Sequence, residues 1–175
     1  MILTGQRATE IAGLRWNEIS FDEDLISLPD ARTKNGHPHS IPMSSPVREI
    51  LRAELRKREL VFGVGGAGFV GWHKAVRRLN ERISHKLGAP LSHWTIHDLR
   101  RTLATGLQRL GVRLEVTEAI LNHVGGSRSG VAGIYQRHDW ATEKRQALDA
   151  WAAHVLAAVS GKKGKSNVTA IRSRA

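Results

Sequence analysis

The sequence contains no cysteine and has far fewer acidic than basic residues. Without cysteine the chain can form no disulfide, no thiolate zinc site and no thiol nucleophile. The 16 Asp and Glu face 27 Lys and Arg, which gives a net charge of +11. No Asp/Glu pair has an evident metal-ligand arrangement, although a two-metal nuclease needs several convergent carboxylates. A chain this basic favours a polyanionic partner such as nucleic acid.

Long apolar segments are also missing. No run approaches the roughly 18 residues that span a bilayer, and the start MILTGQRATE lacks the basic region and apolar core of a secretory signal. We therefore predict an intracellular protein without membrane association. The 175 residues are 41% hydrophobic, enough for a folded core. Residues 161–175 hold five Lys and Arg and no acid, which predicts a disordered basic tail after one domain over residues 1–160.

The hydrophobic periodicity predicts a mainly α-helical protein with a small antiparallel β-sheet, an α+β class. Residues 4–15 read as a short helix. Residues 18–43 alternate apolar and polar side chains and read as two or three strands, with the turn signal Asn35-Gly36 between the last two. Helical patterns follow over 46–60, 70–85, 96–110 and 114–121, in a short segment carrying Tyr135, and after Asp139 to about Val159.

The helix at 96–110 has the clearest signals. Thr95 reads as its N-cap and Asp98 completes a variant capping box. Four leucines then follow at spacings of four, four and three, which predicts a buried stripe: Leu99, Leu103, Leu107 and Leu110.

Two residues of this helix could bind an anion. At about 100° per residue, Arg100 lies beside the leucine stripe, where a buried guanidinium needs an anionic partner. Arg101 lies on the opposite side and reads as a solvated charge. His97 lies in the first turn, where free backbone N–H groups favour an anion. Together His97 and Arg100 would suit a phosphate.

Several other residues have both a structural and a functional interpretation. Tyr135 is the only tyrosine and could be a partly buried aromatic residue. Arg7 and Glu10 could form a surface ion pair. His123 could be a favourable charge at a helix C-terminus. We interpret His37-Pro38-His39 as part of a hairpin turn, because no third metal ligand is evident.

Five motifs in chain order give these residues a common meaning: TGQRATEIAGLRW, TKNGHPHSIPMS, HDLRRTLATGLQRLGV, ILNHVGGS and GVAGIYQRHD. Together they resemble the catalytic domain of tyrosine recombinases of the phage and prophage integrase type. The resemblance covers residues 1 to about 158. It implies the tyrosine recombinase catalytic-domain fold and site-specific DNA recombination, the integration or excision of mobile DNA.

The resemblance also implies a catalytic set, supported by Glu10: Arg7, Lys34, His97, Arg100, His123 and Tyr135. In these roles Tyr135 attacks a DNA phosphorus and forms a 3′-phosphotyrosyl bond. The two arginines bind the non-bridging oxygens, His97 accepts the tyrosine proton and His123 donates a further hydrogen bond. Lys34, the only lysine before Lys57, protonates the departing 5′-oxygen.

The implied partners are double-stranded DNA and other recombinase protomers, in a tetramer on DNA. No metal or cofactor is expected, because the phosphotyrosyl link conserves the bond energy. The implied location is the bacterial cytoplasm, in association with the nucleoid.

Two departures from the family pattern leave alternatives open. Asn122 replaces the glycine of the Leu-Gly-His motif. Met1 lies six residues before Arg7, so we expect the opening helix of the catalytic domain and the N-terminal DNA-binding domains to be missing. A catalytically inactive integrase remnant that binds only DNA or recombinase partners is therefore one alternative. A relaxing enzyme like the type IB topoisomerases, with the same chemistry, is another.

Overall fold

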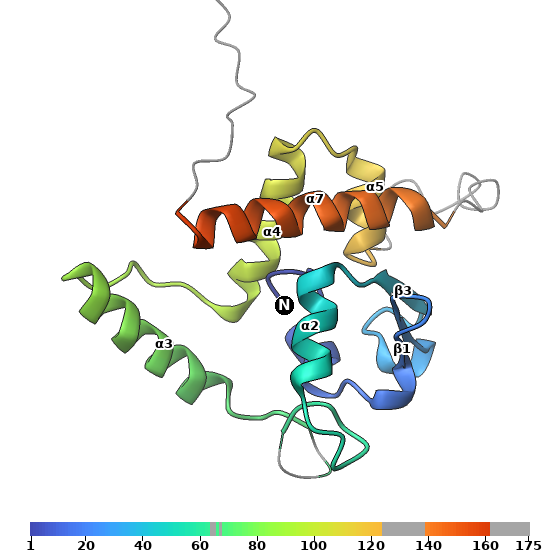
Figure 1. The fold of residues 1–175 in the computed structure, drawn as a ribbon, viewed down its shortest axis with the longest axis horizontal. Coiled ribbons are helices and arrows are strands. Elements are labelled where there is room, and N and C mark those ends of the chain that lie inside the picture. The colour runs from blue at the N-terminus through green and yellow to red at the C-terminus, as the bar shows by residue number, and fades with distance from the viewer. Residues whose placement is uncertain (64–65, 67, 124–138, 162–175) are drawn as a thin grey trace, which may run out of the picture.

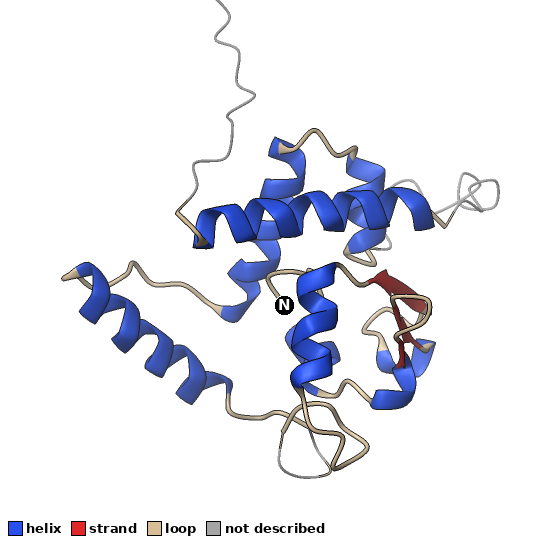
Figure 2. Ribbon diagram, viewed as in Figure 1, coloured by secondary structure: helices blue, strands red, loops and turns tan. Residues whose placement is uncertain are grey.

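The computed structural model describes residues 1–63, 66, 68–123 and 139–161, and it is mainly helical with one small sheet (Figures 1 and 2). In chain order the described elements are α1 (Ala8–Ala12), the 3₁₀ helix η1 (Trp16–Glu18), β1 (Ile19–Ser20), β2 (Leu25–Leu28), the 3₁₀ helix η2 (Asp30–Arg32), β3 (His39–Pro42), α2 (Ser45–Ala53), α3 (Trp72–Leu87), α4 (Ile96–Arg109), α5 (Leu114–Ile120) and α7 (Ala141–Val159). Within these ranges we find no helix with the length and apolarity that crossing a membrane requires.

The sheet is antiparallel with the strand order β1-β2-β3. Ile26 of β2 pairs with Ile19 of β1 on one side and with Ile41 of β3 on the other. Ile26 and Ile41 are each only 1% exposed, so the alternating residues of these strands face the core as the period-two pattern predicts. α7 lies against β3, where Lys144 Nζ donates to Ser40 O at 2.9 Å.

The core joins α4, α5 and α7, and the long α7 crosses α4 in Figure 1. The two helices approach closely at Gly106, where a Cβ would collide with the indole of Trp151. The Trp151 side chain is buried, and its Nε1 donates to Ile2 O at 2.8 Å. α7 thus ties the N-terminal residues to α4 within one chain.

The capping signal of α4 is confirmed, but its leucine stripe is shorter than predicted. Thr95 and Asp98 form the capping box, with Thr95 N–H donating to Asp98 Oδ2 at 2.7 Å. Leu103 and Leu107 are fully buried. Leu110 is 41% exposed because the helix ends at Arg109.

Two predicted helices are wrong in length. Within 4–15 only Ala8–Ala12 is helical, since Gly5 has a φ of +68° and Arg7 is extended with ψ of 151°. The helix predicted over 46–60 ends at Ala53. Residues 59–61 instead pair with residues 14–16, for example through Val61 N–H to Leu14 O at 2.8 Å. These backbone bonds between distant segments override the local helical pattern.

Candidate active site

Arg7 and Glu10 form the first part of the site, around the start of α1. Arg7 Nη1 lies 2.9 Å from Glu10 Oε1, and the Arg7 backbone N–H donates to Glu10 Oε2 at 2.9 Å. The Glu10 side chain is only 3% exposed. The pair is therefore more than a surface ion pair, because a buried carboxylate fixes both the backbone and the guanidinium of Arg7.

Arg100 is the buried cation of the site, with 3% of its surface exposed on α4. Its Nη1 donates to Gly5 O at 2.6 Å, and its Nη2 donates to Leu121 O. Burial, reinforced by the charge of Arg7, lowers the pKa of Arg100 to about 10. The side chain stays charged at neutral pH all the same.

The predicted anionic partner of Arg100 is not a protein carboxylate within the described part of the chain, where two carbonyl oxygens accept its hydrogen bonds. A guanidinium has five N–H groups. Three of them are left unused by these two bonds. A desolvated arginine close to a second arginine, with unused donors, is arranged to receive an anion such as a phosphate oxygen.

The end of α5 joins the segments that carry the candidate residues. Ile120 O accepts from Gln6 Nε2 at 2.9 Å and from His39 Nε2 at 3.0 Å. The Arg100 guanidinium binds the next carbonyl, Leu121 O, and Asn35 Nδ2 binds the carbonyl of Asn122 at 2.7 Å. Donors from the N-terminal segment, β3, α4 and the β2–β3 connection thus satisfy the last carbonyls of one helix.

His123 follows this helix end and has an oriented imidazole. Its Nδ1 lies 3.0 Å from Glu118 Oε2. A carboxylate at Nδ1 favours the tautomer in which Nδ1 carries the proton, and it directs Nε2 away from Glu118. The side chain is 41% exposed, so Nε2 can reach a ligand in solvent.

Lys34 lies on a longer connection than the Asn-Gly signal predicts. β2 and β3 are joined by residues 29–38, which include η2, and Gly36 adopts a φ of +69°. Thr33 Oγ1 braces this connection by donating to His37 O at 2.8 Å. Lys34 itself is exposed, and no hydrogen bond or ion pair joins it to another described residue.

The two remaining candidates are not placed with the others by any contact. His97 is exposed in the first turn of α4, and among the described residues it has no hydrogen-bond or ion-pair partner. Tyr135 lies outside the described residues. The structure therefore joins the segments of Arg7, Lys34, Arg100 and His123.

Sequence reasoning missed four residues that organise this site: Gln6, His39, Glu118 and Asn35. Gln6, His39 and Asn35 hydrogen-bond to backbone carbonyls that are distant in sequence. Glu118 hydrogen-bonds to His123, five residues later, which is not a helical spacing. Gln6, Asn35 and His39 lie in the motifs quoted above, but the sequence indicates only turn roles for Asn35 and His39 and no role for Gln6. His39 begins the edge strand β3 and is buried, with 6% of its surface exposed.

His39 makes the stability of this region pH-dependent. Burial, with repulsion from Lys144, lowers the pKa of His39 from 6.5 to about 4. The unfolded chain therefore binds the proton first as pH falls. We expect the free energy of unfolding to fall by about 3 kcal/mol between pH 6.5 and pH 4 from this group. We would measure the free energy of unfolding by urea at several pH values in this range. It should depend less steeply on pH in His39→Gln, because glutamine keeps an amide donor but cannot titrate. Equal slopes in both proteins would contradict the assignment.

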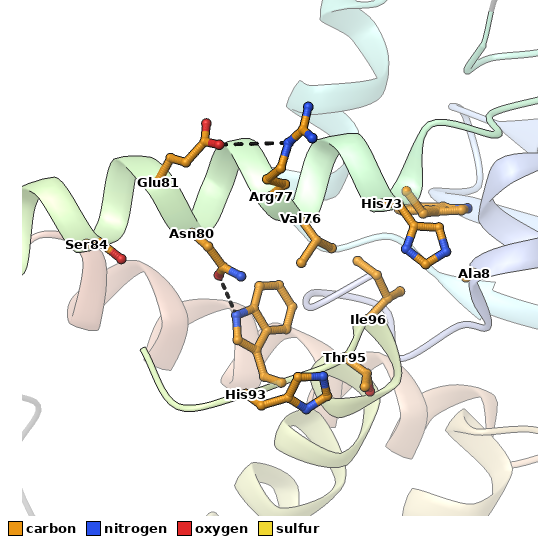
Figure 3. A pocket seen from close by; sticks show the side chains of 12 residues that line it. Ala8, His73, Val76, Arg77, Asn80, Glu81, Ser84, His93, Thr95 and Ile96 are labelled. Carbon is orange, nitrogen blue, oxygen red and sulfur yellow. Dashed lines mark hydrogen bonds and ion pairs between the residues drawn. The ribbon is translucent and has the colours of Figure 1, made fainter. Parts of the chain in front are cut away.

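A cavity of about 740 Å³ adjoins the site, between α3 and the start of α4 (Figure 3). Its lining includes Ala8 and Ile96, the neighbours of Arg7 and His97. On the α3 side Asn80 accepts a hydrogen bond from Trp94 Nε1 at 2.7 Å. α3 is thus held beside the site on one face and has no fully buried residue.

Comparisons with known proteins agree with this architecture. The sequence model described as the phage integrase family matches residues 1–141. The chain is 30% identical to prophage integrase IntA of Escherichia coli (strain K12), over 98% of this chain and 41% of that protein. It is 26% identical to prophage integrase IntZ of the same strain, over 92% of this chain and 39% of that protein. The chain therefore spans about two-fifths of the length of these curated relatives.

Solved structures show the same fold. The integrase from mycobacterium phage Brujita matches with a TM-score of 0.61 at 18% identity, over 85% of this chain and 47% of that one. The Tn1549 transposon integrase in complex with transposon right end DNA matches with a TM-score of 0.60 at 18% identity, over 86% of this chain and 56% of that one. The predicted mainly helical fold with a small antiparallel sheet is confirmed.

Proposed function

The chain belongs to the phage integrase family, and from this premise we propose that it carries the strand-transfer site of a site-specific DNA recombinase. The observation that supports this most directly is the buried Arg100 beside Arg7. Burial and the neighbouring charge lower the pKa of Arg100, and binding of an anion would offset both effects. The scissile phosphate of DNA is the anion that we assign to this position.

In the proposed mechanism Tyr135 is the nucleophile. Its oxygen attacks the phosphorus, a 3′-phosphotyrosyl bond forms, and the bond to the 5′-oxygen breaks. A tyrosine hydroxyl has a pKa of about 10 and needs a proton acceptor at neutral pH, a role that we assign to His97. Lys34 gives a proton to the departing 5′-oxygen. A 5′-hydroxyl of a second strand then attacks the phosphotyrosyl bond, which completes the exchange.

The charge stabilisation comes from side chains that the structure orients. Arg7 and Arg100 would bind the non-bridging oxygens, where planar guanidinium groups make paired hydrogen bonds. Glu10 holds Arg7 in place. His123 holds Nδ1 on Glu118, and in its imidazolium form it would also donate from Nε2. These cationic groups and the tyrosine suffice for transesterification, so the proposed reaction consumes no nucleotide and uses no metal ion.

The proposed partner is double-stranded DNA, with further recombinase protomers in a tetramer on it, in the bacterial cytoplasm at the nucleoid. Support for DNA comes from α3, which has five Lys and Arg and one Glu. Lys74, Arg78 and Arg82 recur every four residues and share one face. All three are exposed, and among the described residues none of them forms an ion pair.

We expect this face of α3 to contact phosphates. Replacing both Arg78 and Arg82 by Gln should weaken DNA binding for all sequences. The plot of log K against log salt concentration has a negative slope, and its magnitude should fall by about 2. Fluorescence anisotropy at several salt concentrations measures this slope. Replacing Arg52 and Arg56, which stack over Phe21 and Trp16, removes the same charge and should change the slope much less. If the two double variants changed the salt dependence equally, the effect would come from the total charge of the protein and not from contacts of α3 with phosphates.

The proposal is tested by incubating the protein with supercoiled plasmid in EDTA and stopping the reaction with SDS. Plasmid offers many sequences, so the target site need not be known. EDTA suppresses contaminating metal-dependent nucleases. Relaxed plasmid together with a protein–DNA adduct is the expected result. Tight DNA binding with neither product would contradict the proposed activity and favour a DNA-binding remnant.

A further inference from the structure

Two asparagines join the connection that carries Lys34 to the end of the helix that precedes His123. Asn35 Nδ2 donates to Asn122 O at 2.7 Å, and Asn122 Nδ2 donates to Asn35 Oδ1 at 3.2 Å. Asn122 Nδ2 also lies 3.4 Å from His37 O. The contact spans 87 residues of sequence: the Asn35 side chain both donates and accepts, while Asn122 donates from its side chain and accepts at its backbone carbonyl.

The burial and backbone of Asn122 show why an asparagine suits this position. Asn122 is 4% exposed, and its φ is +48°, in the left-handed region. Asparagine and glycine tolerate this region better than other residues do. Glycine would fit the backbone but would leave Asn35 without its side-chain partner. The asparagine therefore adds a bridge to a conformation that a glycine could also adopt.

The neighbours of the two asparagines make the bridge relevant to the site. Asn35 follows Lys34 directly, and Asn122 precedes His123 directly. Inside the connection Asn35 Oδ1 also accepts from His37 N–H at 3.2 Å. The Lys34 side chain itself is exposed. Its backbone is therefore held on one side by Thr33 and on the other by Asn35, while the ammonium remains able to move.

We propose that Asn35 and Asn122 form an amide clamp that positions Lys34 relative to His123 for protonation of the 5′-oxygen. The inference rests on the proposed function, and it adds two positioning residues to that site. Without the clamp the ten-residue connection can shift against the end of α5. A displacement of about 1 Å at a reacting group lowers a rate by on the order of 100-fold.

The activity test uses plasmid relaxation in EDTA. Asn122→Gly keeps the left-handed backbone and removes the side-chain donor, and Asn35→Ala removes both hydrogen bonds of the bridge. Each change should slow relaxation roughly 10- to 100-fold, and the double variant should be no slower than Asn35→Ala, because that change already removes both bonds. Asn17→Ala, an exposed asparagine in η1, is the matched control and should match wild type.

A background of Lys34→Ala separates positioning from a general structural role. If the clamp acts through Lys34, then Asn35→Ala should cause no further slowing in this background. A further slowing of 10-fold or more would overturn the proposal. Partial recovery of the rate at lower pH in Lys34→Ala but not in the clamp variants would overturn it as well.

Amide hydrogen exchange gives a readout that needs no DNA. Asn122→Gly should speed exchange over residues 33–37, and Asn35→Ala should speed it at residues 121–123, each by at least about 10-fold. Unchanged exchange at the distant segment would overturn the clamp. If wild type forms no DNA adduct, the proposed function fails, while hydrogen exchange still decides whether the two segments are coupled.

Discussion

Replacing Tyr135 by phenylalanine is expected to abolish covalent DNA adducts. Removing an enzyme nucleophile lowers a rate by on the order of 10⁵- to 10⁶-fold, which places the product below detection. The composition makes this prediction sharp, because the chain has one tyrosine and no cysteine. No second tyrosine or thiol can therefore take over the attack. SDS trapping on plasmid in EDTA, followed by proteolysis and mass determination of the DNA-linked peptide, is the measurement.

The phenylalanine variant should still bind DNA. The change removes one hydroxyl and leaves the buried arginine and the basic face of α3 intact. Its affinity and salt slope, from the same anisotropy titrations, should equal those of wild type. Adducts that persist in Tyr135→Phe would show that another group attacks the phosphorus. Loss of both adducts and DNA binding would instead point to a folding defect.

Sequence reasoning succeeded where a local rule decides the structure. The capping box of Thr95 and Asp98 places the start of α4 correctly, because its hydrogen bonds join residues three apart. The alternation of apolar residues indicates two or three strands, and the described sheet has three. The angle of Arg100 beside the leucine stripe also predicts its burial correctly, at 3% exposed.

The same reasoning failed where a distant partner decides. The pattern after Pro46 is helical to Leu60, yet the helix ends at Ala53 because residues 59–61 pair with residues 14–16. Asn122 reads as a small departure from a motif, and its bridge to Asn35 could not be found without knowing that the two segments meet. Helix periodicity contains no information about such contacts, so the organisation around α5 required the structure.

Replacing Arg100 by lysine is the second change with a large expected effect. A lysine keeps the charge but offers a compact ammonium in place of a planar fork. Arg100 binds Gly5 O and Leu121 O and has three further N–H groups for a phosphate, whereas the three donors of a compact ammonium would have to serve all three partners from one point. We expect the rate of adduct formation to fall by at least about 100-fold, the scale of removing one transition-state donor.

In Arg100→Lys the free energy of unfolding should fall only modestly, while the rate of adduct formation falls strongly. One of two buried carbonyls loses its donor, at a cost of about 1–3 kcal/mol. Urea unfolding should therefore show a folded protein with a modestly lower free energy of unfolding. Arg101→Lys is the matched control on the same helix, because the Arg101 side chain is 73% exposed and pairs only with Asp98 among the described residues. It should change neither quantity appreciably.

The outcome bears on why an arginine is buried here at all. Burial lowers the pKa of Arg100 to about 10, so the folded protein holds this charge at a cost that two carbonyl bonds only partly offset. A residue kept for stability alone should leave the adduct rate of Arg100→Lys close to wild type once folding is allowed for. A large loss of rate in a folded variant would show that the remaining donors act on the phosphate. The unfavourable burial would then be the means by which the site keeps those donors free of water before DNA arrives.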